Sequence, residues 1–307
     1  MTQKQLFFAI TGSCMIVWAW TVLVFAQAPQ EVQINVTKLG QNLHLLQDSG
    51  GMGNSVALTG EDGALLTDTK VEASVDGLLA EVEKLGGGPL RFTILTHWHF
   101  DHVGGNQKVA KTGAVIVSHE NVRHQMSIPH DMKLLNNKVA PSPEAALPQM
   151  TFAREIVFHM NGETVKVFHL APGHTDGDAV VHFQKANVIQ MGDLYFEGLY
   201  PYIGIYSGGS INGMIEVIQQ LLPMMDEHTK VVPGHGPLSN KAKLQAYVAM
   251  LATIRDNVAG LIRDGKTLEA AIAAKPTRAF DEKWGKGFLP PDRFAELVYM
   301  DLSPNLP

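Results

Sequence analysis

The sequence predicts an α/β (α+β) fold with two strand-rich halves, each followed by helices, and a helical segment at the end. Three observations support this prediction. Alternating apolar residues recur through 32–67 and 155–191, apolar residues at helical spacing follow at 68–85 and 210–222, and the spacing is helical from Leu238 onward. Because the order of strands and helices is repeated, we expect a pseudo-duplicated sandwich of sheets.

The first half is expected to begin as an antiparallel meander, because its period-two segments are separated by glycine- and aspartate-rich turns. A glycine-rich stretch ending in proline, 86–89, would end its first helix. In order, the expected elements are strands at 32–36, 42–47, 55–59 and 64–67, a helix at 68–85, a strand at 91–96, a helix at 105–111, a strand at 114–118 and a helix from His119.

The second half opens after a long segment, 129–150, which carries four prolines and no clear period. Loops of this length in compact domains are usually lids, binding loops or disordered, so we expect a surface excursion. The elements expected after it are strands at 155–159, 164–170, 178–183 and 187–191, a helix at 210–222, a strand at 230–232 and helices over 244–258, 268–274 and 291–302.

The N-terminus has the features of a targeting segment. Residues 6–25 are almost wholly apolar, and Lys4 is the only charged side chain before Glu31. We predict a signal peptide over 1–26, cleaved after Ala26, and hence a periplasmic or secreted protein. The alternative is an uncleaved membrane anchor formed by 6–25, because about 20 apolar residues can span a bilayer.

Cysteine and charge narrow the classes of function. Cys14 is the only cysteine and lies inside the predicted signal, in a context that fits lipoprotein processing only weakly. The mature chain would then have neither a disulfide nor a thiolate metal ligand. The formal net charge of −6 argues against a nucleic-acid partner and leaves a small molecule as the expected substrate.

One motif dominates the chain, the run His97-Trp-His-Phe-Asp-His102 after the apolar strand at 91–96. Three histidines and an aspartate so close together are hard to explain as packing, because buried polar groups need partners. A metal ion is the simplest partner. The carboxyl ends of strands are also where open α/β sheets bind ligands.

Three further motifs place a polar residue next to glycine directly after an apolar strand. They are Pro172-Gly-His174, Gly192-Asp193 and Pro233-Gly-His235-Gly236. One tetrahedral ion uses about four ligands including water, so the combined set predicts two metal ions. Imidazole with carboxylate suits zinc, and iron or manganese is an alternative at the second site. The candidate ligands are His97, His99, Asp101, His102, His174, Asp193 and His235.

Together these motifs resemble the metallo-β-lactamase superfamily. The resemblance spans roughly 32–236 and implies an αββα four-layer sandwich of two mixed β-sheets flanked by helices, in a domain over 31–237 with a helical extension over 238–307. It assigns His97, His99 and His174 to one metal ion and Asp101, His102 and His235 to the second, with Asp193 as the bridge. An aspartate at 193 is similar to glyoxalase II and the lactonases, whereas true β-lactamases typically have cysteine or serine there.

The resemblance implies an exported hydrolase with two Zn²⁺ ions, in which a metal-bound hydroxide attacks a lactam, lactone, ester or thioester carbonyl. Asp101 would be catalytic, orienting the hydroxide and shuttling a proton. One alternative is a true metallo-β-lactamase, although no lysine or arginine lies between Lys185 and Lys230 to hold a substrate carboxylate. Others are a mononuclear non-haem iron dioxygenase and a metal-bearing protein without turnover.

Substrate contacts are expected from the aromatic- and serine-containing loop after Asp193, although packing is a competing explanation for its tyrosines. Met52 could overhang the site. Local alternatives remain for two ligands, since Asp101 could cap a helix and Asp193 could close a turn. Asp68 is expected to cap a helix or orient a metal ligand, and the eight other histidines are expected to be structural. The candidate substrate-binding residues are Tyr195, Tyr200, Tyr206, Ser207 and Ser210.

The helix over 244–258 has an apolar stripe that is expected to pack on the sandwich or to form a contact in a homo-oligomer.

Overall fold

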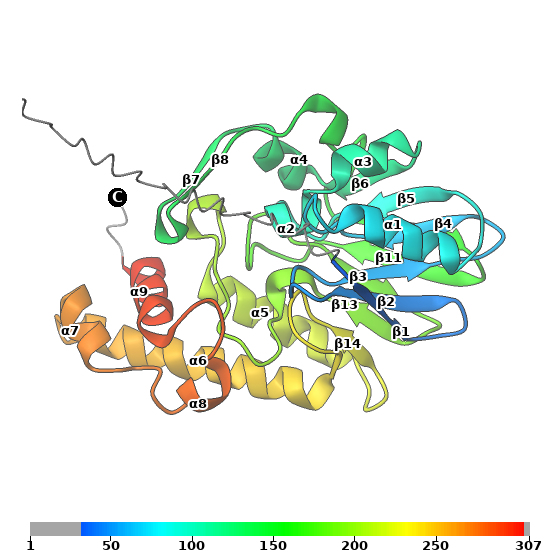
Figure 1. The fold of residues 1–307 in the computed structure, drawn as a ribbon. Coiled ribbons are helices and arrows are strands. Elements are labelled where there is room, and N and C mark those ends of the chain that lie inside the picture. The colour runs from blue at the N-terminus through cyan, green and yellow to red at the C-terminus, as the bar shows by residue number, and fades with distance from the viewer. Residues whose placement is uncertain (1–31, 304–307) are drawn as a thin grey trace, which may run out of the picture. The chain divides into compact units, whose positions relative to one another are not determined.

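Two mixed sheets form the centre of the protein in the computed structural model, which describes residues 32–303 (Figure 1). In the first sheet, neighbouring strands are antiparallel from β1 to β4 and parallel from β4 to β9. Its strands, in spatial order, are β1 (Ile34–Lys38), β2 (Leu43–Asp48), β3 (Ser55–Leu58), β4 (Ala64–Thr67), β5 (Leu90–Ile94), β6 (Val115–His119) and β9 (Met150–Phe152).

The second sheet is antiparallel except where β13 pairs with β14 in parallel. Its strands, again in spatial order, are β10 (Glu155–Met160), β11 (Glu163–Phe168), β12 (Val180–Phe183), β13 (Val188–Gln190), β14 (Lys230–Val232) and β15 (Ser239–Asn240). A separate hairpin joins β7 (His130–Met132) to β8 (Asn137–Val139).

Helices cover the outer faces of both sheets. Figure 1 shows α1, α3 and α4 beside the first sheet and α5 and α6 beside the second, so the predicted αββα order is confirmed. The α-helices are α1 (Val75–Lys84), α2 (Phe100–Val103), α3 (Asn106–Lys111), α4 (Glu120–Met126), α5 (Ile211–Leu221), α6 (Lys241–Arg263), α7 (Leu268–Ala273), α8 (Asp281–Trp284) and α9 (Pro291–Leu302). Short 3₁₀ helices lie at η1 (Lys133–Leu135), η2 (Glu144–Ala146), η3 (Gly192–Leu194), η4 (Ile205–Ser207) and η5 (Leu222–Met224).

Two apolar cores follow from this layering. One cluster lies between the sheets and includes Val56, Val117 and Val181, all without exposed surface. The other fills the spaces between sheets and helices, where Leu78 of α1 and Ile215 of α5 are buried. Burying one such side chain stabilises the fold by about 1.5–3 kcal/mol, so these layers hold the strand ends in place.

The first helix differs from the prediction. It begins at Val75 rather than at residue 68, because Asp68 and Lys70 have φ of 51° and 59°. Side chains disfavour this left-handed conformation, and a right-handed helix cannot run through it. The segment 129–150 also differs, because β7, β8 and two 3₁₀ helices give it regular structure that its sequence did not predict.

The C-terminal helices pack as part of the same compact unit, which begins at Val32. Helix α6 lies against α5, and α9 lies against α6. The predicted boundary at 237/238 stays a prediction, and the predicted signal over 1–26 and the alternative anchor over 6–25 lie outside the described residues. Among the helices in the described part of the chain, none has the length and apolar character needed to cross a membrane.

Candidate metal centre

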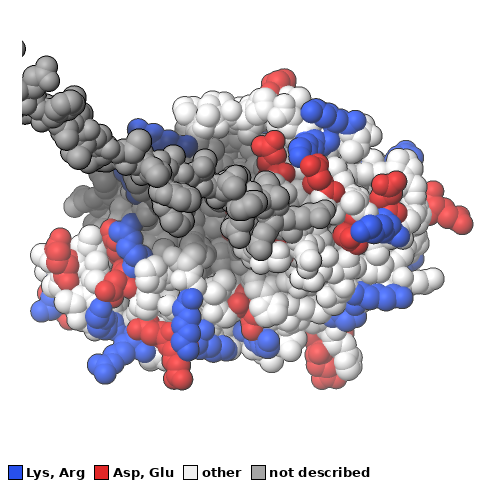
Figure 2. Space-filling model, in the orientation of Figure 1, with Lys and Arg blue, Asp and Glu red and all other residues white. Residues whose placement is uncertain are grey.

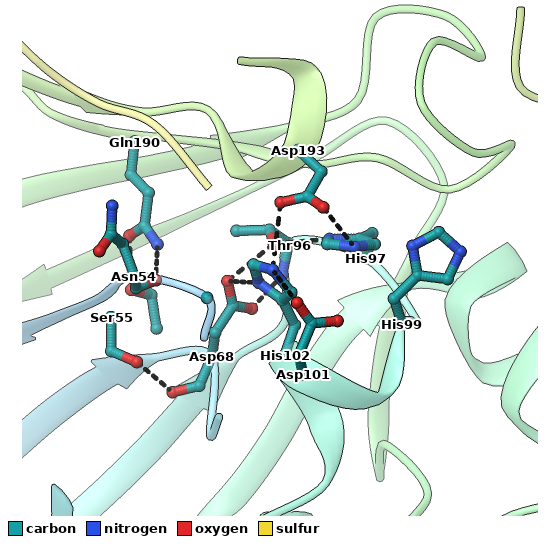
Figure 3. Close-up of polar contacts among 12 residues, drawn as sticks. Asn54, Ser55, Asp68, Thr96, His97, His99, Asp101, His102, Gln190 and Asp193 are labelled. Carbon is teal, nitrogen blue, oxygen red and sulfur yellow. Dashed lines mark hydrogen bonds and ion pairs between the residues drawn. The ribbon is translucent and has the colours of Figure 1, made fainter. Parts of the chain in front are cut away.

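All seven candidate ligands follow the carboxyl ends of strands. Those from the first sheet, His97 to His102, come after β5, in the loop and short helix α2 (Figure 3). The others come after β11, β13 and β14. Strands that end side by side bring these loops to one edge of the sandwich. The structure gathers the ligands into two groups, which are His97, His99, His174 and Asp193 in one and Asp101, His102 and His235 in the other.

The first group is buried and borders the cavity only in part. His99 Nδ1 and His174 Nε2 face each other at 2.8 Å. His97 Nε2 lies 3.6 Å from Asp193 Oδ2 and has no hydrogen-bond partner although it is buried. Buried ring nitrogens that point at one another need either a shared proton or a cation, and a cation also supplies the missing partner of His97. The donor set therefore fits a metal ion.

The second group lies nearer the surface, around Asp101. The Oδ2 atom of Asp101 is 3.0 Å from His235 Nε2 and 3.7 Å from His102 Nε2, and these two nitrogens are 3.5 Å apart. His99, rather than Asp101, is the N-cap of α2, so the carboxylate of Asp101 faces the histidines instead of capping the helix. Two imidazoles and one carboxylate form a suitable set for zinc and similar ions.

Asp193 contacts both groups. Its Oδ1 is 3.1 Å from His102 Nε2, and its Oδ2 is 3.5 Å from both His174 Nε2 and His235 Nε2. Asp193 lies in the 3₁₀ turn η3, where Gly192 has φ of 51° and approaches Thr96. The turn therefore directs this carboxylate between the two sets of imidazoles instead of leaving it in solvent.

A further set of hydrogen bonds orients the rings. Asp68 Oδ2 is 2.8 Å from His102 Nδ1, and Asp68 also accepts hydrogen bonds from the Thr96 amide and hydroxyl at 2.7 and 2.8 Å (Figure 3). His174 Nδ1 is 2.8 Å from the Tyr202 carbonyl oxygen. A hydrogen-bond partner on Nδ1 of each ring fixes its tautomer and directs Nε2 toward the other candidate ligands. Asp68 thus orients a candidate ligand and does not cap a helix.

Asn54 and two glycines fix the loop that carries His235. The Asn54 side chain donates hydrogen bonds to the carbonyl oxygens of Pro233 and Gly236, both at 2.9 Å, and joins a loop of the first sheet to one of the second. A Cβ on Gly234 would lie 1.9 Å from Asp193 Oδ1, and one on Gly53 would lie 2.4 Å from the His102 ring. Glycine is required where a backbone passes this close to ligands.

The histidines of the first group favour the neutral form. Burial lowers the pKa of His99 to about 3 and holds the pKa of His97 well below its ordinary value, with neighbouring imidazoles adding to the shift. Burial also lowers the pKa of His174. Neutral imidazole is the form that binds metal.

Carboxylates reverse this effect in the second group. Burial favours neutral rings there too, but Asp193 and Asp101 outweigh it, raising the pKa of His235 to about 10 and that of His102 well above its ordinary value. Burial opposes ionisation of Asp101, yet His102 and His235 hold its pKa below the usual range. Without metal, protons therefore take the place of a cation in this group.

A buried lysine supports the loop beneath the second group. Lys70 is fully buried, and its Nζ donates hydrogen bonds to the carbonyl oxygens of Leu46 at 3.0 Å and Gly53 at 2.6 Å. Burial lowers its pKa to about 8, partly opposed by Asp48 and Asp68. The sequence did not identify this residue, because lysine is ordinarily exposed.

The predicted substrate residues fall into two sets. Tyr195 is buried, with its hydroxyl bonded to Glu197 and to Ser239 at 2.7 Å. Tyr200 stacks on Phe294 of α9, and the Ser210 hydroxyl caps α5. None of these three lines the cavity at the ligands, because hydrogen bonds, ring stacking or a helix cap hold their side chains elsewhere.

The other two predicted residues, Tyr206 and Ser207, line a cavity of about 310 Å³ next to the ligand His99. Trp98 and His130 also line it, with their rings stacked at 4.0 Å. His130 was expected to be structural, and its Nε2 does contact the Gln125 carbonyl oxygen at 2.7 Å. His119 is structural as expected, since it caps α4.

Acidic and basic side chains are interspersed over the described surface of the face in Figure 2. Nucleic-acid binding would call for a concentration of basic residues.

Comparison with known proteins agrees with this geometry. The chain is 28% identical over 207 residues to hydroxyacylglutathione hydrolase GloC of Haemophilus influenzae, covering 66% of this chain and 89% of that protein. It is 24% identical to metallo-beta-lactamase IND-1 of Chryseobacterium indologenes, covering 69% and 85% of the two chains.

Among solved structures, a metallo-beta-lactamase from Pontibacter korlensis shares the fold with a TM-score of 0.58 at 23% identity, over 72% of this chain and 99% of that one. The family model described as the metallo-beta-lactamase superfamily matches residues 48–239, which contain all seven candidate ligands. The chain therefore belongs to the metallo-beta-lactamase superfamily and is a metal-dependent hydrolase.

Proposed function

We propose that this protein is an exported hydrolase that holds two zinc ions and cleaves a carbonyl compound, namely an ester, lactone, thioester or lactam. The position of Asp193 is the observation that supports two ions rather than one. One carboxylate lies within 3.6 Å of ring nitrogens from both ligand groups, and a carboxylate shared in this way can neutralise two cations at once. A single ion would leave one group of imidazoles without a partner.

Bound at these ligands, two divalent ions would lower the pKa of water to about neutral and polarise a carbonyl. The chain itself supplies a proton acceptor. Asp101 is ionised, and its side chain is 13% exposed beside the cavity. Its Oδ2 can take the proton of an attacking water and return it to the leaving group as the bond from the carbonyl carbon to oxygen, sulfur or nitrogen breaks.

The cavity favours an ester, lactone or thioester over a β-lactam. Among the described residues that line it, none is lysine or arginine, and the same holds for the neighbouring cavity lined by Tyr206 and Ser207. A β-lactam carboxylate would therefore rely on serine or on the metal ions. Similarity to a hydroxyacylglutathione hydrolase supports a thioester or ester among the candidates.

The test is metal analysis of the purified mature protein, followed by a panel of lactams, lactones, esters and thioesters on the same preparation. Two zinc equivalents with turnover of a lactone, ester or thioester would support the proposal. A carbapenem or cephalosporin opened at a much higher rate would instead make the protein a β-lactamase. One iron per chain with oxygen uptake and no hydrolysis would contradict the proposal.

The role of Asp101 has its own test. Asp101→Asn keeps the shape and an oxygen that can bind metal but cannot accept a proton, so turnover measured at zinc concentrations that fill both groups should fall by about 10²–10⁴-fold. Full turnover with both metals present would show that another group moves the proton.

Export is proposed from the apolar segment 6–25 and the small residue Ala26. Expression of the full chain in a Gram-negative host, with N-terminal sequencing of the periplasmic fraction, should give a chain that begins at Gln27. Recovery of the uncut chain in the membrane fraction would favour the anchor.

A further inference from the structure

The cavity at the metal ligands has a largely apolar wall. It has a volume of about 330 Å³, which lies in the range of small-molecule sites. Its walls come from parts of the chain that are far apart in the sequence, including the loop after β2, α2, the β7–β8 hairpin and the C-terminal segment. The side chains that form the apolar wall are Met52, Phe100, Met132, Phe196, Tyr202 and Phe288.

Two phenylalanines of this wall leave much of their surface open. Phe288 is 56% exposed and Phe100 is 47% exposed. Exposed apolar surface next to a polar site commonly marks a place where a ligand binds. Here the apolar surface borders the ligands directly, since Phe196 stacks on His235 with ring centroids 5.1 Å apart and lies 6.3 Å from the Phe288 ring.

The C-terminal segment holds Phe288 in this position. Phe288 lies between α8 and α9, and its neighbours Trp284 and Leu289 are buried. The Tyr200 amide donates to the Trp284 carbonyl oxygen at 3.0 Å, and the Tyr200 hydroxyl bonds to Asp281 at 2.9 Å. Hydrogen bonds before the exposed ring and the buried Leu289 after it hold the loop, so the fold sets the backbone position of Phe288.

Charge limits what this wall can bind. Apart from Asp101, Asp193 and the histidine ligands, the described residues that line the cavity carry no ionisable group other than the Tyr202 phenol. A tyrosine phenol is neutral at physiological pH. Against the apolar wall, away from the metal ligands, a carboxylate or phosphate would lose hydration without gaining a lysine or arginine partner. A hydrocarbon group has no such hydration to lose, and each CH₂ buried against the wall stabilises the bound state by about 0.8 kcal/mol.

We infer that the substrate carries an uncharged hydrocarbon group beside the carbonyl that is cleaved, and that Phe288 is a specificity-determining residue that contacts this group. The inference rests on the proposed carbonyl hydrolase function. It assigns a role in substrate selection to Phe288, which lies outside the segment that matches the family model.

The first experiment measures kcat/KM of the zinc-loaded protein on p-nitrophenyl esters from acetate to decanoate, beside esters of the same length that end in a carboxylate. We expect kcat/KM to rise up to about fourfold per added CH₂ until the cavity is filled. The carboxylate-ended esters should be at least about tenfold poorer. Hydrolysis that does not depend on chain length, or that favours the carboxylate, would overturn the inference.

Three variants locate the effect. Phe288→Ala should reduce the chain-length dependence, chiefly through KM of the longer esters, and Phe288→Leu should restore most of it. Met224→Ala is the matched control, because Met224 is 44% exposed and lines neither cavity at the ligands. An unchanged dependence in Phe288→Ala would show that this ring does not contact the substrate.

A binding measurement separates this inference from the proposed function. Straight-chain methyl ketones carry a carbonyl but no leaving group, and their binding can be followed by calorimetry. Affinity that rises with chain length, with a negative heat-capacity change and a loss in Phe288→Ala, would support the apolar site even if no ester were hydrolysed. Ester hydrolysis with no chain-length effect on either binding or rate would overturn the inference alone.

Discussion

The two groups of candidate ligands use the same residue types in opposite electrostatic settings. In the first, burial keeps His97, His99 and His174 neutral. In the second, Asp193 and Asp101 overcome burial and hold protons on His102 and His235. A metal ion entering the first group displaces no proton from these imidazoles, whereas one entering the second must displace protons. The groups should therefore differ in how metal binding depends on pH.

Asp193 links the two groups, so its removal should have the largest effect. Asp193→Ala takes away the carboxylate that contacts His97, His102, His174 and His235. Because loss of an outer-shell partner alone costs about 10–100-fold, we expect loss of this shared ligand to cost more than about 10²-fold in turnover. Zinc content should fall to one equivalent or less.

Metal analysis and steady-state kinetics check this prediction. Asp76→Ala is the control, because the Asp76 side chain is 76% exposed and pairs with Lys108 rather than with a candidate ligand. Two tightly bound equivalents in Asp193→Ala would mean that the groups are independent.

The pH dependence of the metal-free protein should separate the groups next. The pKa of His235 is about 10 in the folded state and about 6.5 when unfolded. Its contribution to stability is therefore fully present below pH 6.5 and is lost as the pH rises toward 10. Metal affinity of the second group should change in the opposite direction, rising about tenfold per pH unit for each proton displaced.

Thermal unfolding of the metal-free protein between pH 6.5 and 9.5, with zinc titration at each pH, measures both effects. His235→Ala should remove much of the pH dependence and bind one equivalent, while His99→Ala should keep the dependence. Equal pH dependence for the two zinc equivalents would contradict the difference between the groups.

The sequence pointed to the candidate ligands of both groups by one local signal, because each lies beside a glycine or within two residues of another candidate ligand, after an apolar strand. Their division into two groups was predicted only from the family resemblance. Apolar patterns also placed the strands of both sheets to within a few residues, except β9 and β15, which the sequence did not predict. Both signals depend only on residues close together in the sequence, so they can be recognised without knowledge of the fold.

Other features depend on contacts between distant segments. The aromatic loop after Asp193 predicted a substrate wall. Its composition could not show that Tyr195 and Tyr200 are buried, or that Phe288 of the C-terminal segment lines the cavity instead. In the same way, the left-handed backbone at Asp68 and Lys70 shortened a helix that periodicity extended. These two residues support the second group from beneath, and they supply the two smaller predictions.

Asp68→Asn tests the support of the second group. Asparagine tolerates the left-handed backbone of this position, so the fold should be kept. The amide cannot replace both the contact with His102 Nδ1 at 2.8 Å and the bonds from Thr96. We expect zinc affinity of the second group to fall about 10–100-fold, while the first equivalent binds as in the wild type. Equal weakening of both equivalents in a calorimetric titration would assign Asp68 to the whole centre.

Lys70→Met should have the smallest effect on the metals and act mainly on the fold. The substitution leaves the carbonyl oxygens of Leu46 and Gly53 without their buried donor, which costs about 1–3 kcal/mol. Gly53 packs against the His102 ring, and the same loop carries the Gly51 carbonyl oxygen that lies 3.0 Å from His235 Nδ1. Denaturant unfolding should therefore show lower stability, and zinc titration a loss confined to the second equivalent. Wild-type stability in Lys70→Met would mean that water or a shift of the loop satisfies both carbonyl groups. The cost of burying the Lys70 charge would then cancel the stabilisation from its two hydrogen bonds.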